Sequence, residues 1–163
     1  MIVLGIDPGS NFTGYGIIRD DKNHQTALTY GRINVKGKST AERLFQIYSE
    51  LHAIIAKYQP EEMAIEQVFF HRNAQSALKL GQARGAAMVA GAALALPVTE
   101  YSAKQIKQAA VGYGAADKKQ IQHMIRILLK LNETPEEDAA DALAIAICHC
   151  QTQRLTRKLA EIL

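Results

Sequence analysis

Four acidic residues lie in otherwise apolar segments, where an ionised carboxylate is costly unless a cation or a hydrogen-bond donor meets it. Asp7 ends the run IVLGID, Glu66 ends the run MAIE, and Asp138 and Asp141 lie in DAADALAIAIC. Because carboxylate oxygens are preferred ligands of hard divalent cations, four such residues from three distant segments indicate a shared magnesium-type site. The alternative is that they are scattered structural acids or acids at the rim of the molecule.

Asp138 and Asp141 are three residues apart in a segment with helical periodicity, so they share one face of the predicted helix. Ile145 continues that face, which becomes apolar as the helix proceeds inward. In the simpler alternative, these acids only stabilise the N-terminus of the helix through its dipole. That role suits Glu136 and Glu137 better, because Asp141 lies beyond the first turn.

Such a set of acids fits hydrolysis of a phosphodiester bond by two divalent ions about 4 Å apart, which serve both ends of an in-line displacement. We expect Asp7 to bridge the two ions, because it comes from the most central strand. Glu66 would then hold one ion, and Asp138 with Asp141 the other. Magnesium suits an all-oxygen site and keeps several waters, one of which becomes the nucleophile, and manganese would substitute for it.

The composition indicates an ordinary globular protein, and its charge would suit a polyanionic partner. The chain has 163 residues, of which 48% are hydrophobic and 21% are charged, so we expect one domain with a proper core. Net charge is +3, and the basic excess grows if metal neutralises the four acids. No apolar stretch reaches the length of a membrane span, and the N-terminus lacks a basic segment typical of a leader, so we expect a cytoplasmic protein.

The apolar pattern predicts strands at residues 2–7, 14–19, 27–35, 63–67 and 97–101. Helices are predicted from 40 to about 58, at 73–94, at about 103–110, and from 117 and 134 onward. At the last of these starts, Thr134 suits the cap, Pro135 the first position and Glu137 the third. Residues 20–23 are expected to form a turn, and residues from about 151 to 163 a frayed tail. This order favours an α/β fold with a five-stranded mixed sheet flanked by helices.

Lysines near the predicted loop at 112–116 are candidates for phosphate contacts. Lys104 and Lys107 share a helical face just before it, and Lys118 and Lys119 follow at a helix N-terminus, where free N–H groups also favour phosphate. The alternative for any such group of lysines is a solvated surface.

Cys148 and Cys150 are the only cysteines, and no second pair of ligands completes a metal site around them. We therefore interpret both as small buried residues.

Four segments, in order, carry a family resemblance: GIDPGSNFTGYG, AIEQVFF followed by Asn73, SALKLGQARG and DAADALAIAI. Together they span nearly the whole chain and resemble the RuvC-type Holliday junction resolvases of bacteria. The resemblance implies a ribonuclease H-like fold, a homodimer, and magnesium-dependent cleavage of four-way DNA junctions during recombination and repair. It also implies the branch-migration proteins RuvA and RuvB as partners.

The resemblance also implies roles for individual residues. Four acids match the family's catalytic and metal-binding residues: Asp7, Glu66, Asp138 and Asp141. Lys107 and Lys118 match contacts near the scissile phosphate, and Phe69 matches an aromatic residue used against bases at the junction centre, where stacking supplies the physical reason.

The predicted Ala- and Gly-rich helix carries Gly81, Gly85 and Gly91 in a spacing that permits close backbone approach. In most proteins this spacing means tight packing on a sheet. The homodimer implied by the family places an interface nearby, because symmetric resolution needs two active sites related by a two-fold axis.

Three other functions stay open. Actin-like and sugar-kinase ATPases also begin with Gly-Ile-Asp-x-Gly, which binds ATP phosphate, but they need two such lobes and this chain supplies one. A nuclease that processes structured RNA would use the same fold. A non-catalytic junction-binding protein is the third, and the complete set of acids argues against it.

Overall fold

The computed structural model describes residues 1–21, 24–68 and 73–162. The described strands are β1 (Ile2–Asp7), β2 (Phe12–Asp21), β3 (His24–Asn34), β4 (Glu62–Glu66) and β5 (Val98–Tyr101). The described helices are α1 (Thr40–Tyr58), α2 (Ala74–Ala93), α3 (Ala103–Val111), α4 (Lys118–Leu128) and α5 (Glu137–Ile162). Phe69, the predicted stacking residue, lies outside the described residues.

The strands form one mixed sheet in the order β3-β2-β1-β4-β5. The β1–β2 and β2–β3 pairs are antiparallel, whereas β1–β4 and β4–β5 are parallel. Because β1 is central and β4 runs parallel beside it, Asp7 and Glu66 leave the sheet at the same edge, one residue after the registered pair Ile6 and Ile65. The predicted five-stranded mixed sheet is confirmed.

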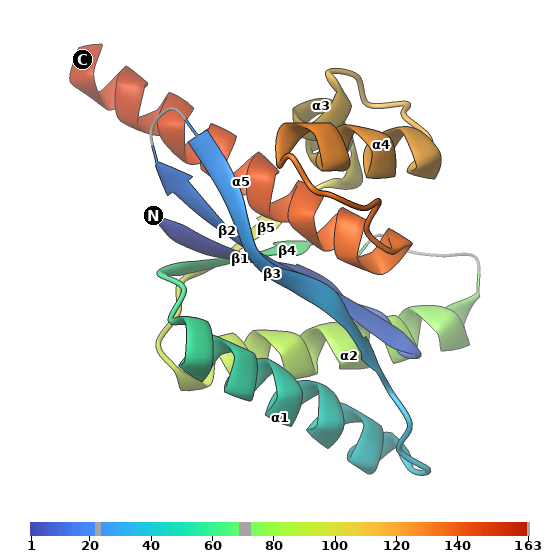
Figure 1. Cartoon of the computed structure of the whole chain (residues 1–163). Helices are drawn as coiled ribbons and strands as arrows, with labels where there is room; N and C mark the ends of the chain where they lie inside the picture. Colours follow the sequence, from blue (N-terminus) through green and yellow to red (C-terminus); the bar gives the residue numbers. More distant parts are fainter. Residues whose placement is uncertain (22–23, 69–72, 163) are drawn as a thin grey trace.

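Helices cover both faces of this sheet (Figure 1). Helices α1 and α2 lie side by side on one face, over a core that includes Leu4, Ile6 and Met63. Helix α5 crosses the other face, over a core that includes Val3 and Leu143, and α3 and α4 pack beyond it. The residues of β1 alternate between these two cores, as the period of a strand requires.

Helix α1 begins and ends where local chemistry dictates. The Ser39 hydroxyl accepts from the Glu42 N–H, and the Glu42 carboxylate accepts from the Ser39 N–H, which completes a capping box. The helix ends at Gln59, whose φ of 47° is left-handed, directly before Pro60. Its predicted start and end are therefore confirmed.

Glycines let α5 lie directly on the sheet. Gly5 and Gly16 face each other across β1 and β2. A Cβ on Gly5 would lie 2.0 Å from the Ala142 carbonyl oxygen, and a Cβ on Gly14 would lie 2.0 Å from that of Asp138. Any larger residue would push the helix away. These contacts fix the depth at which α5 presents its acidic residues.

The predicted start of α5, with Thr134 as cap and Pro135 as first residue, is wrong by two residues. Its first described residue is Glu137, and the Glu136 carbonyl accepts from the Ala140 N–H at 2.8 Å. Tertiary contacts hold the preceding segment outside the helix: Pro135 is buried, its carbonyl accepts from Gln122 Nε2 at 3.0 Å, and Glu136 pairs with β3.

The predicted turn at residues 20–23 is also wrong at its start, because β2 continues through Asp21. Asp20 is buried and forms an ion pair with Arg154 of α5, which anchors the end of the strand to the helix. Helix α5 continues past Gln151 to Ile162. No helix in the described part of the chain has the length and apolar character to span a bilayer.

Candidate active site

The predicted acids converge at the edge of the sheet where β1 and β4 end. Asp7 closes β1 and Glu66 closes the parallel neighbour β4, while Asp138 and Asp141 occupy the first two turns of α5 above them. A cavity of about 300 Å³ lies between these elements, and its polar lining consists of Asp7, Glu66, Asp141, Lys107 and Lys118. We call it the acidic cavity. Its remaining lining is apolar, from Ala103, Ile106, Ile121 and Ile145.

Thr13 holds the turn that follows Asp7. Its fully buried hydroxyl donates to the Gly9 carbonyl at 2.9 Å and accepts from the Gly9 N–H at 3.4 Å. Sequence reasoning missed this residue. The available signal was a polar residue at an inward-facing position of a strand next to a candidate catalytic acid.

Arg84 of α2 holds the strand end that carries Glu66. Its Nε donates to the Glu66 carbonyl at 3.1 Å, and its Nη2 lies 2.5 Å from the Glu100 carboxylate of β5. Arg84 therefore ties β4, β5 and α2 together beside the cavity. Sequence reasoning also missed it, although it is the one arginine in the Ala- and Gly-rich helix.

Asp138 and Asp141 share a side of α5 but not the same surroundings. Asp141 lines the acidic cavity, whereas Asp138 lies toward β3, with its Oδ2 3.6 Å from Nη1 of Arg32. The same guanidinium pairs with Glu136 at 2.8 Å and lies 4.3 Å from the centre of the Phe12 ring. The guanidinium of Arg32 thus lies beside Asp138, the more exterior of the two acids. This contact joins distant segments, so the spacing of residues in the sequence does not predict it.

The acidic cavity carries an excess of buried negative charge. Burial is the largest cause that raises the pKa of Asp7 well above its ordinary value, and three neighbouring carboxylates raise it further: Asp141, Glu66 and Asp138. Burial also raises the pKa of Asp141 to about 6, against the opposing charge of Lys118. Both acids would ionise more readily if a cation lay between them.

The donor set suits a hard divalent cation in its chemistry, because it consists of carboxylate oxygens that repel one another in a partly buried cavity. In the described part of the chain, however, no three His, Cys, Asp or Glu side chains are arranged to hold a metal ion. The acids therefore share a cavity and an electrostatic field, and rotation of their side chains is required to form a ligand set.

The structure separates the four predicted lysines into two pairs. Lys107 and Lys118 line the acidic cavity, whereas Lys104 and Lys119 are exposed and do not belong to its lining. Lys118 forms an ion pair with Glu137 of α5, and this hydrogen bond is the main cause that raises the pKa of Lys118.

The region around Cys148 and Cys150 has no role in this site. Both thiols are buried, and burial raises the pKa of Cys148 to about 11, which leaves it unreactive. His149 between them is fully buried and hydrogen-bonds with the Tyr101 hydroxyl at 2.9 Å and with Glu62 Oε2 at 2.7 Å. The interpretation of both cysteines as small buried residues is confirmed.

Comparisons with known proteins agree over nearly the full chain. The family model described as crossover junction endodeoxyribonuclease RuvC matches residues 3–149. A curated protein of that description from Coxiella burnetii (strain Dugway 5J108-111) is 58% identical over 160 residues, which cover 98% of this chain and 93% of the relative.

Solved structures give the same result. The structure of Thermus thermophilus RuvC superposes with a TM-score of 0.86 at 34% identity, covering 96% of this chain and 97% of that one. The T. thermophilus protein in complex with a Holliday junction substrate has a TM-score of 0.86 at 32% identity, covering 95% and 96% of the two chains. The expected ribonuclease H-like fold is confirmed.

Proposed function

The chain belongs to the RuvC family of crossover junction endodeoxyribonucleases, and we propose that it resolves four-way (Holliday) DNA junctions by metal-dependent hydrolysis of phosphodiester bonds. The observation that carries this proposal is the acidic cavity, where three carboxylates of β1, β4 and α5 meet Lys107 and Lys118. Carboxylates suit metal binding, and lysines beside them suit binding of a phosphate. The same cavity therefore offers ligands for the metal ions and for the DNA phosphate.

Asp7, Glu66 and Asp141 would hold magnesium, with Asp138 completing the set from the rim and manganese as a substitute. Divalent ions there would supply Lewis acidity toward the phosphate and a nucleophilic water at neutral pH. Two ions per site agree with four carboxylates, because each ion then has acidic ligands of its own.

The chain's own residues attract and orient the substrate. Lys107 and Lys118 place positive charge at the cavity, and α4 begins at Lys118, so the backbone N–H groups of its first turn add to the attraction for phosphate. Ile106, Ile121 and Ile145 form an apolar wall, which strengthens the electrostatic interactions inside the cavity by keeping water away from that side.

A homodimer is supported by one face of α2. Leu78 and Val89 are exposed, and a Cβ on Gly81 or Gly85 would meet nothing within 4 Å in the described chain. Gly91 differs, because its Cβ would lie 2.6 Å from the Met63 sulfur, so its small size serves packing on the sheet. The exposed face suits the close approach of a second copy, which would supply the second active site that paired cleavage needs.

We extend the proposal to the bacterial cytoplasm as location, to RuvA and RuvB as partners, and to Phe69 as the residue that stacks on bases at the junction centre. The family membership supports these three points. Phe69 follows β4 and Glu66 closely in sequence, which favours a position within reach of DNA held at the acids.

A synthetic four-way DNA junction tests the proposed function. We expect paired nicks near the branch point that require magnesium, with little cleavage of a linear duplex or of a four-way RNA junction. Binding without cleavage at any magnesium concentration would favour the non-catalytic junction binder. Hydrolysis of ATP by the protein without DNA would favour the ATPase lobe.

A further inference from the structure

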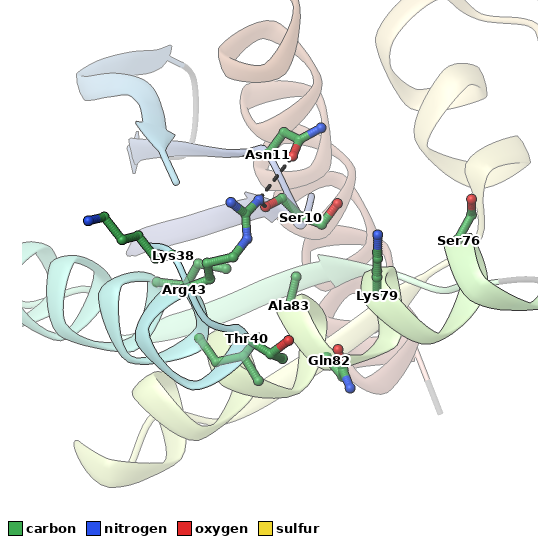
Figure 2. A pocket seen from close by; sticks show the side chains of 11 residues that line it. Ser10, Asn11, Lys38, Thr40, Arg43, Ser76, Lys79, Gln82 and Ala83 are labelled. Atoms are coloured by element: carbon green, nitrogen blue, oxygen red, sulfur yellow. Dashed lines mark hydrogen bonds between the residues drawn. The ribbon is translucent and has the colours of Figure 1, made fainter. Parts of the chain in front are cut away.

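A second cavity, outside the acidic one, is distinctly basic. It has a volume of about 550 Å³ and lies between the turn after β1, the first turns of α1 and the first half of α2 (Figure 2). Three cations line it: Lys38, Arg43 and Lys79. None of the described residues in its lining is acidic, and its other polar side chains are Ser10, Asn11, Thr40, Ser76 and Gln82. We call it the basic pocket.

Arg43 is held in the basic pocket by neutral groups alone. Its Nη2 donates to the Ser10 carbonyl at 2.5 Å and to Asn11 Oδ1 at 2.9 Å. Its Nη1 donates to the Val35 and Gly37 carbonyls, each at 3.4 Å. These bonds fix the guanidinium in place without neutralising its charge. A fixed cation of this kind is prepared to meet an anion with little loss of side-chain entropy.

Among the residues that the structure describes, no acidic side chain pairs with the cations of the pocket. The ion pairs found among the described residues do not involve Arg43, Lys38 or Lys79. The carboxylate of Glu42 is close in sequence, but it is engaged in the α1 cap, where it accepts from the Lys38 and Ser39 N–H groups. Arg43 and Lys79 both extend toward the turn that carries Ser10, whereas Lys38 extends toward the outer side (Figure 2).

The basic pocket lies at the same edge of the sheet as the active site. Ser10 and Asn11 belong to the turn that follows Asp7. A third cavity of about 380 Å³ adjoins the acidic cavity, because Asp7 and Glu66 line both, and it reaches α2 at Leu80, the residue after Lys79 of the basic pocket. A long polyanion bound at the acids can therefore extend to the three cations.

We propose that the basic pocket binds backbone phosphates of one arm of the DNA junction while the scissile phosphate lies at the acidic cavity. The pocket offers the fixed positive charge of the Arg43 guanidinium, two ammonium groups and several hydroxyl and amide groups, which attract and bind phosphate oxygens irrespective of base sequence. Its role is to set the position of the arm. This inference rests on the proposed function, since it takes its ligand from the DNA bound at the acids.

The test compares two double variants that lose the same charge. Lys38→Gln with Lys79→Gln removes both exposed ammonium groups of the pocket and leaves Arg43, with its structural hydrogen bonds, in place. Lys57→Gln with Lys158→Gln is the matched control, because these lysines lie near the C-terminal ends of α1 and α5, opposite the active-site edge (Figure 1). Affinity for a four-way junction is measured in chelator over a range of salt concentrations.

We expect the log–log salt slope of the pocket variant to fall by roughly one for each phosphate that the protein no longer binds, and by more than that of the control. Equal slopes and affinities in the two double variants would overturn the inference. If the wild-type protein cleaves the junction while the two double variants bind it alike, the inference about the basic pocket is wrong and the proposed function stands. If the wild type neither binds nor cleaves junctions, the proposed function fails with it.

Discussion

Two half-buried carboxylates, Asp7 and Asp141, set the electrostatics of the acidic cavity. In both, burial and neighbouring acids raise the pKa, so the folded chain holds protons there that the unfolded chain would release. A divalent cation bound there would remove this electrostatic repulsion by replacing the protons. Metal binding would therefore be linked to proton release and to stability at these two side chains.

Asp141 gives this linkage a measurable sign. Its pKa is about 6 in the folded chain against 3.8 ordinarily, so its proton stabilises the fold below pH 4, and this contribution disappears as the pH rises through 6. In chelator, Asp141→Asn should raise the free energy of unfolding at pH 8 by on the order of 2 kcal/mol, after allowance for solvent screening, and by less at pH 5. Thermal denaturation at both pH values measures this.

In the same experiment magnesium should raise the melting temperature of the wild type more at pH 8 than at pH 5, because protons compete with the metal. Glu161→Gln, at an exposed acid near the end of α5, is the control. It should have the same free energy of unfolding as the wild type at both pH values, and magnesium should raise its melting temperature by the same amount as that of the wild type. A wild type that is equally stabilised by magnesium at both pH values would contradict the linkage.

Lysines that line the acidic cavity should affect cleavage, whereas a neighbouring lysine outside the lining should not. Lys107→Ala and Lys118→Ala should each slow junction cleavage by roughly 10-fold or more and lower the salt slope of binding by about one, because each removes a cation that we propose binds phosphate at the acidic cavity. Lys119→Ala, one residue away and outside the cavity lining, is the matched control. Single-turnover cleavage rates measure the effect. If all three variants cleave alike, Lys107 and Lys118 belong to the solvated surface.

At the scale of elements, the packing of α5 on the sheet positions the acids. Gly14 makes this contact at the acids themselves, because a Cβ there would lie 2.0 Å from the Asp138 carbonyl oxygen. Gly14→Ala should therefore lower the stability by about 1–3 kcal/mol and reduce cleavage even in the folded fraction, since the start of α5 must move away from Asp7.

Gly31→Ala serves as the control for this prediction. Gly31 is also a strand glycine, but its Cβ would approach only the hydroxyl end of Tyr15, at 2.9 Å, which can move aside. Denaturant unfolding and cleavage rates separate the two variants. A Gly14→Ala protein that cleaves at the wild-type rate would show that the depth of α5 does not control the site.

The sequence predicted the order of the elements and the acids that converge, because these follow from local patterns. The run of apolar residues before Asp7, the alternation of helices and strands, and the start of α1 at Thr40 all have short-range causes. The parallel pairing of β1 and β4 then brings Asp7 and Glu66 to one edge.

The remaining features depend on contacts between distant segments. Helix α5 begins later than predicted because Pro135 and Glu136 contact α4 and β3. Strand β2 extends beyond its predicted end because Arg154 forms an ion pair with Asp20 there. The cation beside Asp138 comes from Arg32, which is 106 positions away in the chain, so no local pattern could indicate it. The same holds for Arg84, whose partners lie on two different strands.

At the scale of the whole molecule, the active-site edge and the exposed face of α2 define how two copies would act on one junction. Leu78 is exposed and lines an apolar groove with Ala74, Ala77 and Gly81. Leu78→Glu should convert a dimer to a monomer, because it places a charge in the proposed interface. Sedimentation or light scattering at micromolar concentration measures the mass.

Leu155→Glu is the control, because Leu155 is similarly exposed but lies on α5, away from α2. The monomeric Leu78→Glu protein should retain its fold and lose paired cleavage of the two junction strands. A wild type that is monomeric while it makes paired nicks, or a Leu78→Glu variant that remains dimeric, would contradict the proposed interface.

The central claim is that buried carboxylates at the edge of the sheet bind the metal that hydrolyses junction DNA. The most direct measurement is magnesium-dependent cleavage of a four-way junction by Asp7→Asn, with junction binding measured on the same protein. Asp7 has the most central position and keeps its volume in this substitution. We predict a loss of cleavage on the order of 1,000-fold or more, equivalent to about 4 kcal/mol of lost metal catalysis, with binding retained. Cleavage by folded Asp7→Asn at the wild-type rate would contradict the account.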